Sequence, residues 1–234
     1  TRHRTERWAW GASNSADDGT LLSHSLEDGA GRVLRCRSYQ YDAKGNVLRD
    51  SLIGNLTGAE GSQTHTTQAS YSGDRFNLKT QEVDPYGRVI NYSYLPGTDL
   101  MTARLTLQNG KILVREFYEY DDNAMPVRKI VDNGAATGPN DLTGVTERHV
   151  TVIQGKQGKT AVGLPEVIEE RVLDLASGQE KLLKKTVKSY SKEGWVTAEA
   201  VYDATGTLRY TLRRTYDSMG NVTYESDAEG GEIR

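Results

Sequence analysis

The feature that most constrains the fold is an acid followed three residues later by glycine, a short phrase that recurs along the chain. Asp-x-x-Gly occurs seven times in 234 residues, whereas 16 Asp and 24 Gly would give roughly 1.6 copies by chance. Recurrence at this frequency predicts a fold built from repeats of one supersecondary unit. The copies are Asp28/Gly31, Asp42/Gly45, Asp84/Gly87, Asp141/Gly144, Asp203/Gly206, Asp217/Gly220 and Asp227/Gly230.

Each copy has the chemistry of a tight turn between two strands. We expect the Asp carboxylate to accept backbone N–H groups two and three residues ahead, while Gly supplies a positive φ. A Tyr that ends the preceding strand would pack across to its neighbour, with its hydroxyl reaching water or a backbone carbonyl. The next strand restarts two residues after most of these glycines, at Val33, Val47, Val89, Val196, Leu208 and Val222.

We therefore predict that the repeated residues are structural parts of turns. The predicted set is Tyr41, Asp42, Gly45, Asp84, Gly87, Tyr202, Asp203, Gly206, Tyr216, Asp217 and Gly220. Before the acid, tyrosines also alternate at period two, as in Tyr39/Tyr41 and Tyr118/Tyr120, which places both rings on one face of a sheet.

Composition narrows the function classes. The net charge of −3 gives no general attraction to nucleic acid or to an anionic membrane surface. Cys36 is the single cysteine, which excludes an intrachain disulfide framework. No apolar run approaches the roughly 18 residues of a membrane span. Because the chain begins without Met and ends just after a turn signal, we expect it to be a segment of a longer protein.

Two regions interrupt the repeat. Residues 132–165 are rich in Gly and contain one strand-like run, "RHVTVI", so we predict a longer loop excursion from the sheet there. The segment "EVIEERVLDLASGQEKLLKKTVKSY" has the Glu, Lys and Leu content of a helix. Ser177 and Gly178 punctuate its middle, however, and it closes on Tyr190 as other strands do, so we favour a hairpin.

The repeated phrases resemble a known family. Tyr41-Asp42-x-x-Gly45, Asp84-Pro85-Tyr86-Gly87, Tyr202-Asp203-x-x-Gly206 and Tyr216-Asp217-x-x-Gly220 are similar to the YD repeat of rearrangement-hotspot (RHS) proteins. Similar repeats occur in the B/C cocoon of bacterial Tc toxins and in the teneurin ectodomain barrel. The resemblance implies an all-β fold in which antiparallel YD hairpins form a segment of a spiralling, solenoid-like β-sheet shell. Residues 1–234 would then be a single YD-repeat region of a larger shell.

The resemblance also implies a function. Bacterial members of the family use the shell to enclose a C-terminal toxin, so the implied partners are the rest of the RHS chain, that toxin and components of a secretion system. The implied location is secreted or at the cell surface. An alternative is a teneurin-like module for cell-surface adhesion or carbohydrate binding. An enzyme built on a β scaffold is a third hypothesis, which the sequence disfavours.

Two turns depart from the family pattern. Tyr120-Asp121-Asp122-Asn123 continues into Ala124 where Gly is expected, so we predict a different or distorted turn. Many RHS shells end in a self-cleaving Asp-Pro-x-Gly-Leu core. Here Arg88 follows Asp84-Pro85-Tyr86-Gly87 in place of Leu, and ordinary repeats come next, so we assign no protease chemistry to Asp84.

The remaining reactive residues do not form a recognisable site. "GKQGKT" at 155–160 has the end of a phosphate-binding loop but lacks the first Gly of that motif and a following helix. The four histidines have no metal-ligand spacing, and Cys36 has no His partner at a suggestive position. We therefore predict no catalytic, cofactor-binding or metal-binding residue and no cofactor.

Overall fold

The computed structural model describes residues 3–58, 61–226 and 232–233, and every regular element in these ranges is a β-strand. By their internal contacts the residues divide into two units. The first unit comprises Thr1–Asp99 with Thr106–Lys111, and the second comprises Leu100–Leu105 with Ile112–Arg234.

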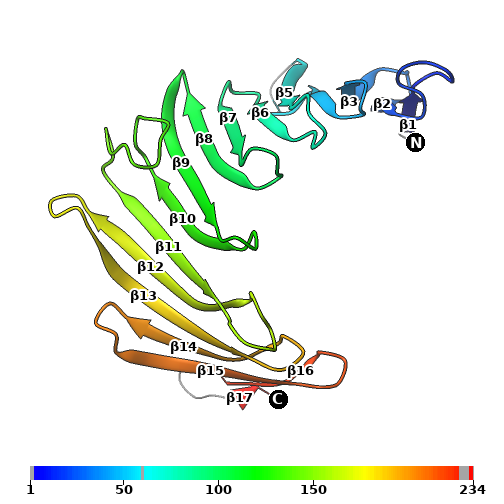
Figure 1. The fold of residues 1–234 in the computed structure, drawn as a ribbon. Coiled ribbons are helices and arrows are strands. Elements are labelled where there is room, and N and C mark those ends of the chain that lie inside the picture. The colour runs from blue at the N-terminus through cyan, green and yellow to red at the C-terminus, as the bar shows by residue number, and fades with distance from the viewer. Residues whose placement is uncertain (1–2, 59–60, 227–231, 234) are drawn as a thin grey trace. The chain divides into compact units, whose positions relative to one another are not determined.

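The first unit is a meander of antiparallel strands that follow one another in chain order (Figure 1). Each strand from the first to the seventh pairs with the next one, so every connection is a hairpin. The strands are β1 (Arg4–Trp10), β2 (Leu21–Asp28), β3 (Val33–Tyr41), β4 (Val47–Gly54), β5 (Gln63–Tyr71), β6 (Lys79–Val83) and β7 (Val89–Tyr94).

The second unit repeats this arrangement with longer strands. From β9 onward each strand is antiparallel to the next. The strands are β8 (Met101–Gln108), which the two units share, β9 (Lys111–Tyr120), β10 (Pro126–Asp132), β11 (Arg148–Gly155), β12 (Pro165–Asp174), β13 (Gln179–Tyr190), β14 (Val196–Asp203), β15 (Leu208–Tyr216), β16 (Val222–Ser226) and β17 (Glu232–Ile233). The prediction of an all-β fold of antiparallel hairpins is confirmed.

The strand boundaries follow the turn chemistry. The six apolar residues expected to restart strands are the first residues of β3, β4, β7, β14, β15 and β16. The segment with helical composition forms the β12–β13 hairpin, because cross-strand pairs such as Glu170–Lys184 satisfy its charges in the sheet. The region 132–165 consists of two loops, 133–147 and 156–164, on either side of β11, which pairs with both β10 and β12.

The described apolar core is small and lies in the second unit. Phe117, Ile130 and Val150 are direct cross-strand partners on β9, β10 and β11, and all three are buried. Val145, in the 133–147 loop, is buried as well. Elsewhere most strand residues are only half-buried, because the strands lie side by side in one layer and both faces of the sheet bear side chains.

The two faces of the first unit differ in chemistry. On one face, which we call the Ser/Thr face, successive strands present the row Ser23, Ser38, Ser51 and Thr66 and the row Arg7, Ser25, Cys36, Ile53 and Thr64. The opposite face, which we call the charged face, presents the row Trp8, His24, Arg37, Leu52 and His65 and the row Tyr39, Asp50 and Thr67.

Candidate functional site

The repeated turn has one hydrogen-bonding pattern, which the turn at Asp42 illustrates. The Gly45 N–H donates to the Asp42 carbonyl at 3.0 Å, and Gly45 adopts a φ of 83°. The Asp42 carboxylate accepts the backbone N–H groups of Lys44 at 2.8 Å and Asn46 at 2.9 Å. A register shift between Gln40 and Tyr41 accompanies the turn, so this hairpin ends in a β-bulge.

The other copies repeat this pattern. The carboxylate of the turn Asp accepts N–H groups two and four residues ahead, which corrects the expected positions two and three ahead. The N–H of the third residue is used instead for the turn bond to the Asp carbonyl, so it is not free for the side chain. The copies with this geometry are Asp28, Asp42, Asp84, Asp121, Asp203 and Asp217.

These hydrogen bonds favour the ionised carboxylate. The side-chain amide of Asn46 and the backbone N–H groups lower the pKa of Asp42 below its usual value. The pKa of Asp217 is lowered in the same way by Asn221, and that of Asp203 by Thr205. These three perturbed acids belong to the turns, where they accept hydrogen bonds from the protein itself.

The turn at Asp121 has the same geometry as the other copies, although Ala124 stands in it where Gly is expected. The Ala124 N–H donates to the Asp121 carbonyl at 2.9 Å, and the Asp121 carboxylate accepts from Asn123 and Met125 at 2.9 Å each. The prediction of a different or distorted turn was wrong, because Ala124 itself adopts a positive φ of 62° in place of Gly. The degenerate copy at Ser191 also forms the turn, with its hydroxyl oxygen in the place of the carboxylate.

The tyrosines before these turns connect neighbouring hairpins. In the described part of the chain, six tyrosines that end odd-numbered strands each donate a hydroxyl hydrogen bond to the first residue of the preceding strand. The hydroxyl therefore reaches across the strand pair, away from its own turn. The pairs are Tyr41 to Leu21, Tyr71 to Val47, Tyr94 to Lys79, Tyr120 to Met101, Tyr190 to Pro165 and Tyr216 to Val196, at 2.6–3.4 Å.

The predicted turn residues do not all lie on one edge. Asp42, Asp121 and Asp217 follow odd-numbered strands, whereas Asp84 and Asp203 follow β6 and β14. Tyr202 therefore lies in an even-numbered strand, directly before its last residue Asp203, and pairs with Leu208 across its own turn. Sequence spacing alone cannot separate these two classes, because it does not count the intervening strands.

Of the two remaining Asp-x-x-Gly copies, one lies in a loop and the other lies outside the described residues. Asp141 and Gly144 lie in the 133–147 loop, where the Asp141 carboxylate accepts the Thr143 N–H at 2.9 Å and no strand follows directly. This copy is therefore not a hairpin turn, since the Val145 N–H donates to the Leu142 carbonyl and not to the Asp141 carboxylate. The copy at Asp227/Gly230 lies outside the described residues.

A buried ionic cluster anchors the 133–147 loop, and the sequence analysis did not find it. The fully buried Arg115 donates from Nε to Asp132 Oδ1 at 2.5 Å and from Nη2 to Asp132 Oδ2 at 3.0 Å. Arg148 adds a bond from Nε to Asp132 Oδ2 at 2.8 Å. The remaining Arg115 N–H groups reach the loop carbonyls of Ala136, Gly138 and Asp141.

All five N–H donors of Arg115 are thus used, which leaves none of them for a ligand. Burial raises the pKa of Asp132, but the hydrogen bonds from Arg115 and Gly134 and the charges of Arg115 and Arg148 together outweigh it and lower that pKa. Gly134 permits this packing, because a Cβ there would lie 2.3 Å from Arg115 Nη2. We interpret the cluster as a structural anchor.

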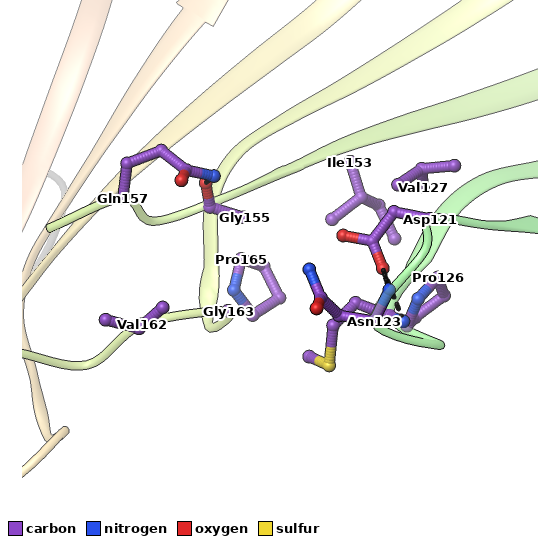
Figure 2. Close-up of a pocket in the computed structure, with 11 residues that line it drawn as sticks. Asp121, Asn123, Pro126, Val127, Ile153, Gly155, Gln157, Val162, Gly163 and Pro165 are labelled. Carbon is purple, nitrogen blue, oxygen red and sulfur yellow. Dashed lines mark hydrogen bonds between the residues drawn. The ribbon is translucent and has the colours of Figure 1, made fainter.

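A cavity of about 280 Å³ lies between the Asp121 turn and the 156–164 loop of the second unit (Figure 2). Its wall is mostly apolar and includes Pro126, Val127, Ile153, Val162 and Pro165. Asp121, Asn123 and Gln157 add polar groups at its border, as Figure 2 shows. This is the clearest concave site that the strands of the second unit form.

The other reactive residues are dispersed. "GKQGKT" occupies the end of β11 and the 156–164 loop, where Lys156 pairs with Glu166 and no helix follows. Cys36 lies within β3 as a free thiol. Within residues 3–58, 61–226 and 232–233, no group of three His, Cys, Asp or Glu side chains is placed to hold a metal.

None of the residues that the structure describes belongs to a helix long and apolar enough to span a bilayer.

The fold is similar to part of two solved crystal structures. No family model and no curated protein matches the chain. It aligns with a chain of the crystal structure of TcdB2-TccC3-Cdc42 at 16% identity, covering 98% of this chain and 14% of that chain, with a TM-score of 0.50. It also aligns with a chain of the crystal structure of TcdB2-TccC3-TEV at 16% identity, covering 93% of this chain and 11% of that chain, with a TM-score of 0.50. The chain thus spans a small part of those chains, and at this identity the likeness concerns the fold.

Proposed function

We propose that this chain is a segment of the wall of an RHS-type β-sheet shell that encloses a toxic C-terminal polypeptide in a secreted bacterial protein. The single observation that carries the proposal is the fold likeness to TcdB2-TccC3 chains over 98% of this chain. The YD phrases at Asp42, Asp203 and Asp217 support the same assignment. We propose a structural role without a catalytic step, with the rest of the shell and its cargo as partners.

The arrangement of the strands is compatible with the wall of a shell. Hairpins that follow one another in chain order can extend a sheet indefinitely, since each new hairpin pairs with the previous one. The tyrosine hydroxyl bonds fasten each hairpin to its predecessor. A single layer needs little apolar core, which agrees with the few buried apolar side chains among the described residues.

We further assign the Ser/Thr face of the first unit to the interior. Its rows of Ser and Thr hydroxyls bear little charge, so an unfolded cargo would be neither bound by apolar contact nor repelled by like charge. The ion pairs Arg37–Asp50 and Lys79–Glu82 lie on the opposite, charged face. On the Ser/Thr face the Arg7–Glu27 ion pair lies at the β1–β2 end, beside these rows.

The assignment is tested by cysteine accessibility in the full-length protein. Thr64 on the Ser/Thr face and Arg35 on the charged face are both exposed in this chain. Each is replaced singly by Cys in a Cys36→Ser background and treated with a bulky maleimide-polyethylene glycol, and the labelled peptide is identified by mass spectrometry. We expect Arg35→Cys to react and Thr64→Cys to react only after the shell is opened with denaturant.

The alternatives give different patterns. Reaction at both positions in the native protein would contradict enclosure. Protection of Arg35→Cys with reaction of Thr64→Cys would reverse the face assignment while retaining a shell. Limited proteolysis of the same full-length protein provides a second measurement, since an enclosed C-terminal polypeptide should resist cleavage until the shell is opened.

A further inference from the structure

The cavity of Figure 2 lies at the one odd-numbered strand end, among β3 to β15, where the repeat tyrosine is missing. The strands β3, β5, β7, β9, β13 and β15 all end in a Tyr that bonds to the first residue of the preceding strand. β11 ends in Gly155 instead. The preceding strand is β10, whose first residue, Pro126, lines the cavity.

The backbone at Gly155 matches that of the tyrosine positions. Gly155 pairs with Pro165, the first residue of β12, after a register shift between Gln154 and Gly155. Tyr41 likewise pairs with Val47, the first residue of β4, after a shift between Gln40 and Tyr41. The Lys156 N–H donates to the Leu164 carbonyl at 2.8 Å. The residue after the repeat tyrosine makes the same bond across its turn at Asp42, Ser72, Asp121, Ser191 and Asp217. Gly155 therefore occupies a tyrosine position without the side chain.

The space left by that side chain is suitable for an aromatic ring. Its volume of about 280 Å³ exceeds the roughly 150 Å³ of an engineered apolar cavity that binds benzene. Val127, Ile153 and Pro165 supply apolar contacts. By analogy with the six filled positions, the carbonyl of Pro126 is the acceptor for a hydroxyl at the far end of the ring.

We propose that this cavity is a docking site for the tyrosine side chain of a second polypeptide segment, whose phenol takes the place of the missing repeat tyrosine. The proposal commits to tyrosine, because six equivalent positions hold that ring and direct its hydroxyl to the equivalent carbonyl. It does not depend on the shell function. The segment would gain the contacts and the hydrogen bond that fasten one hairpin to the next.

The site can be tested on the 234-residue chain with p-cresol, which has the shape of a tyrosine side chain. The chain contains three methionines, of which Met125 lines the cavity and Met219 is 84% exposed. In chain labelled with ¹³C at the methionine methyl groups, we expect p-cresol to shift the Met125 signal saturably and to leave Met219 unchanged. Toluene lacks the hydroxyl and should bind about fivefold more weakly.

Two variants supply matched controls. Gly155→Tyr carries the ring in cis and should abolish the p-cresol effect on Met125. A Cβ at Gly155 would lie 3.3 Å from the Gly163 carbonyl oxygen, so Ile153→Phe serves as a second filling variant should that contact prevent folding. Tyr190→Ala opens an equivalent cavity beside Pro165 and should create a second p-cresol site.

The experiment has results that support the proposal and results that overturn it. Saturable binding that Gly155→Tyr or Ile153→Phe removes supports the proposal. It is overturned if p-cresol binds the Tyr190→Ala cavity but leaves Met125 of the unsubstituted chain unaffected. Equal affinity for toluene, or for isobutane as a mimic of leucine, would overturn the assignment to tyrosine. N-acetyl-tyrosinamide should compete with p-cresol, and failure to compete would exclude a peptide-borne phenol.

Discussion

At the scale of the residue, the repeated turn depends on one position with a positive φ. In most copies this position is Gly, but Ala124 adopts a φ of 62° in the Asp121 turn. For an L-residue this left-handed conformation costs roughly 1–2 kcal/mol. The hydrogen bonds of Asp121 keep the turn regular despite that cost.

Ala124→Gly is therefore expected to stabilise the chain. Glycine removes the strain but adds freedom to the unfolded chain, so the net gain should be roughly 0.5–1 kcal/mol. The measurement is the free energy of unfolding by urea. Unchanged or lower stability in Ala124→Gly would contradict the strained-turn interpretation.

Replacement of a turn glycine by a larger residue is expected to destabilise the chain. Gly45→Val and Gly220→Val should each lower stability by more than about 1 kcal/mol, because φ is 83° and 87° there. The Gly220 variant should lose more, since its Cβ would lie 3.1 Å from Trp195 Cζ2, whereas a Cβ at Gly45 meets nothing within 4 Å. Unchanged melting temperatures in both variants would contradict the turn assignment.

The turn acids also predict how stability depends on pH. Hydrogen bonds lower the pKa of Asp217, and the ion pair with Lys181 lowers that of Asp174 from 3.8 to about 2. A carboxylate with a lowered pKa stabilises the folded state above its unfolded pKa and loses this contribution as the pH falls through its folded pKa. Stability should thus decrease from about pH 5 to about pH 2.

Thermal melts over that range check this expectation, with Asp217→Asn as the informative variant. The amide still accepts the N–H groups of Met219 and Asn221 but cannot be protonated, so its pH dependence should be shallower. A variant as pH-dependent as the original chain would show that Asp217 is not a source of the effect.

At the scale of the element, each tyrosine hydroxyl closes the open end of a strand pair that a turn connects at its other end. Tyr190 donates to Pro165 at 2.6 Å, and burial raises the pKa of its hydroxyl above the usual value. Tyr202 is the residue before the last one of the even-numbered strand β14 and pairs with Leu208 across its own turn. The two tyrosines have the same local sequence signal but different roles.

Tyr190→Phe should lower stability by about 1 kcal/mol, because it leaves the Pro165 carbonyl without this donor. Tyr202→Phe is the control and should change stability by less. Urea unfolding of both variants makes the comparison. Equal losses at Tyr190 and Tyr202 would show that the bond between hairpins contributes nothing specific.

The largest effect of a single substitution is expected in the anchor of the 133–147 loop. Arg115→Met removes the partner of the buried Asp132 and should cost roughly 3–5 kcal/mol. Hydrogen exchange in residues 133–147 should accelerate as the loop detaches. Lys184→Met breaks the exposed pair with Glu170 and should cost at most about 1 kcal/mol. A similar small loss at Arg115 would contradict its anchoring role.

At the scale of the whole molecule, the two units differ in how much apolar surface they bury. Every buried apolar side chain in the described part of the chain belongs to the second unit: Leu105, Phe117, Ile130, Val145, Val150 and Val201. In the first unit, the buried positions described are small, such as Ser51 and Gly54. Local opening should therefore be easier in the first unit.

Native-state hydrogen exchange measures this difference. Amides in β9–β13 should be protected to a greater free energy than amides in β2–β6, although both sets are paired in antiparallel ladders. Equal protection would show that the strand ladders, and not the buried apolar row, set the stability.

Much of the element pattern can be predicted from the sequence because the turn is a local object. An acid and a residue with positive φ three positions later close the chain through bonds that span at most four residues. Val33, Val47 and Val222 could thus be recognised as strand starts. Ala124 could not be recognised, because its φ is imposed by the bonds of its neighbours.

The anchor and the cavity could not be found in this way. Arg115, Asp132 and Arg148 are far apart in the sequence, and nothing in their spacing differs from that of surface charges. The signal for the cavity was the absence of Tyr at the end of β11, which can be read only after the strands have been counted. Both features depend on the pairing register between adjacent strands, which the local Asp-x-x-Gly sequences do not determine.

The sequence by itself thus determined that this chain forms antiparallel hairpins and where most of them turn, because those choices are made by hydrogen bonds between near neighbours. Only the tertiary structure decided which tyrosines fasten hairpins together, which charges are buried and where a cavity remains. These depend on which residues lie opposite one another on adjacent strands, and a shift of one residue would move every side chain to the other face of the sheet.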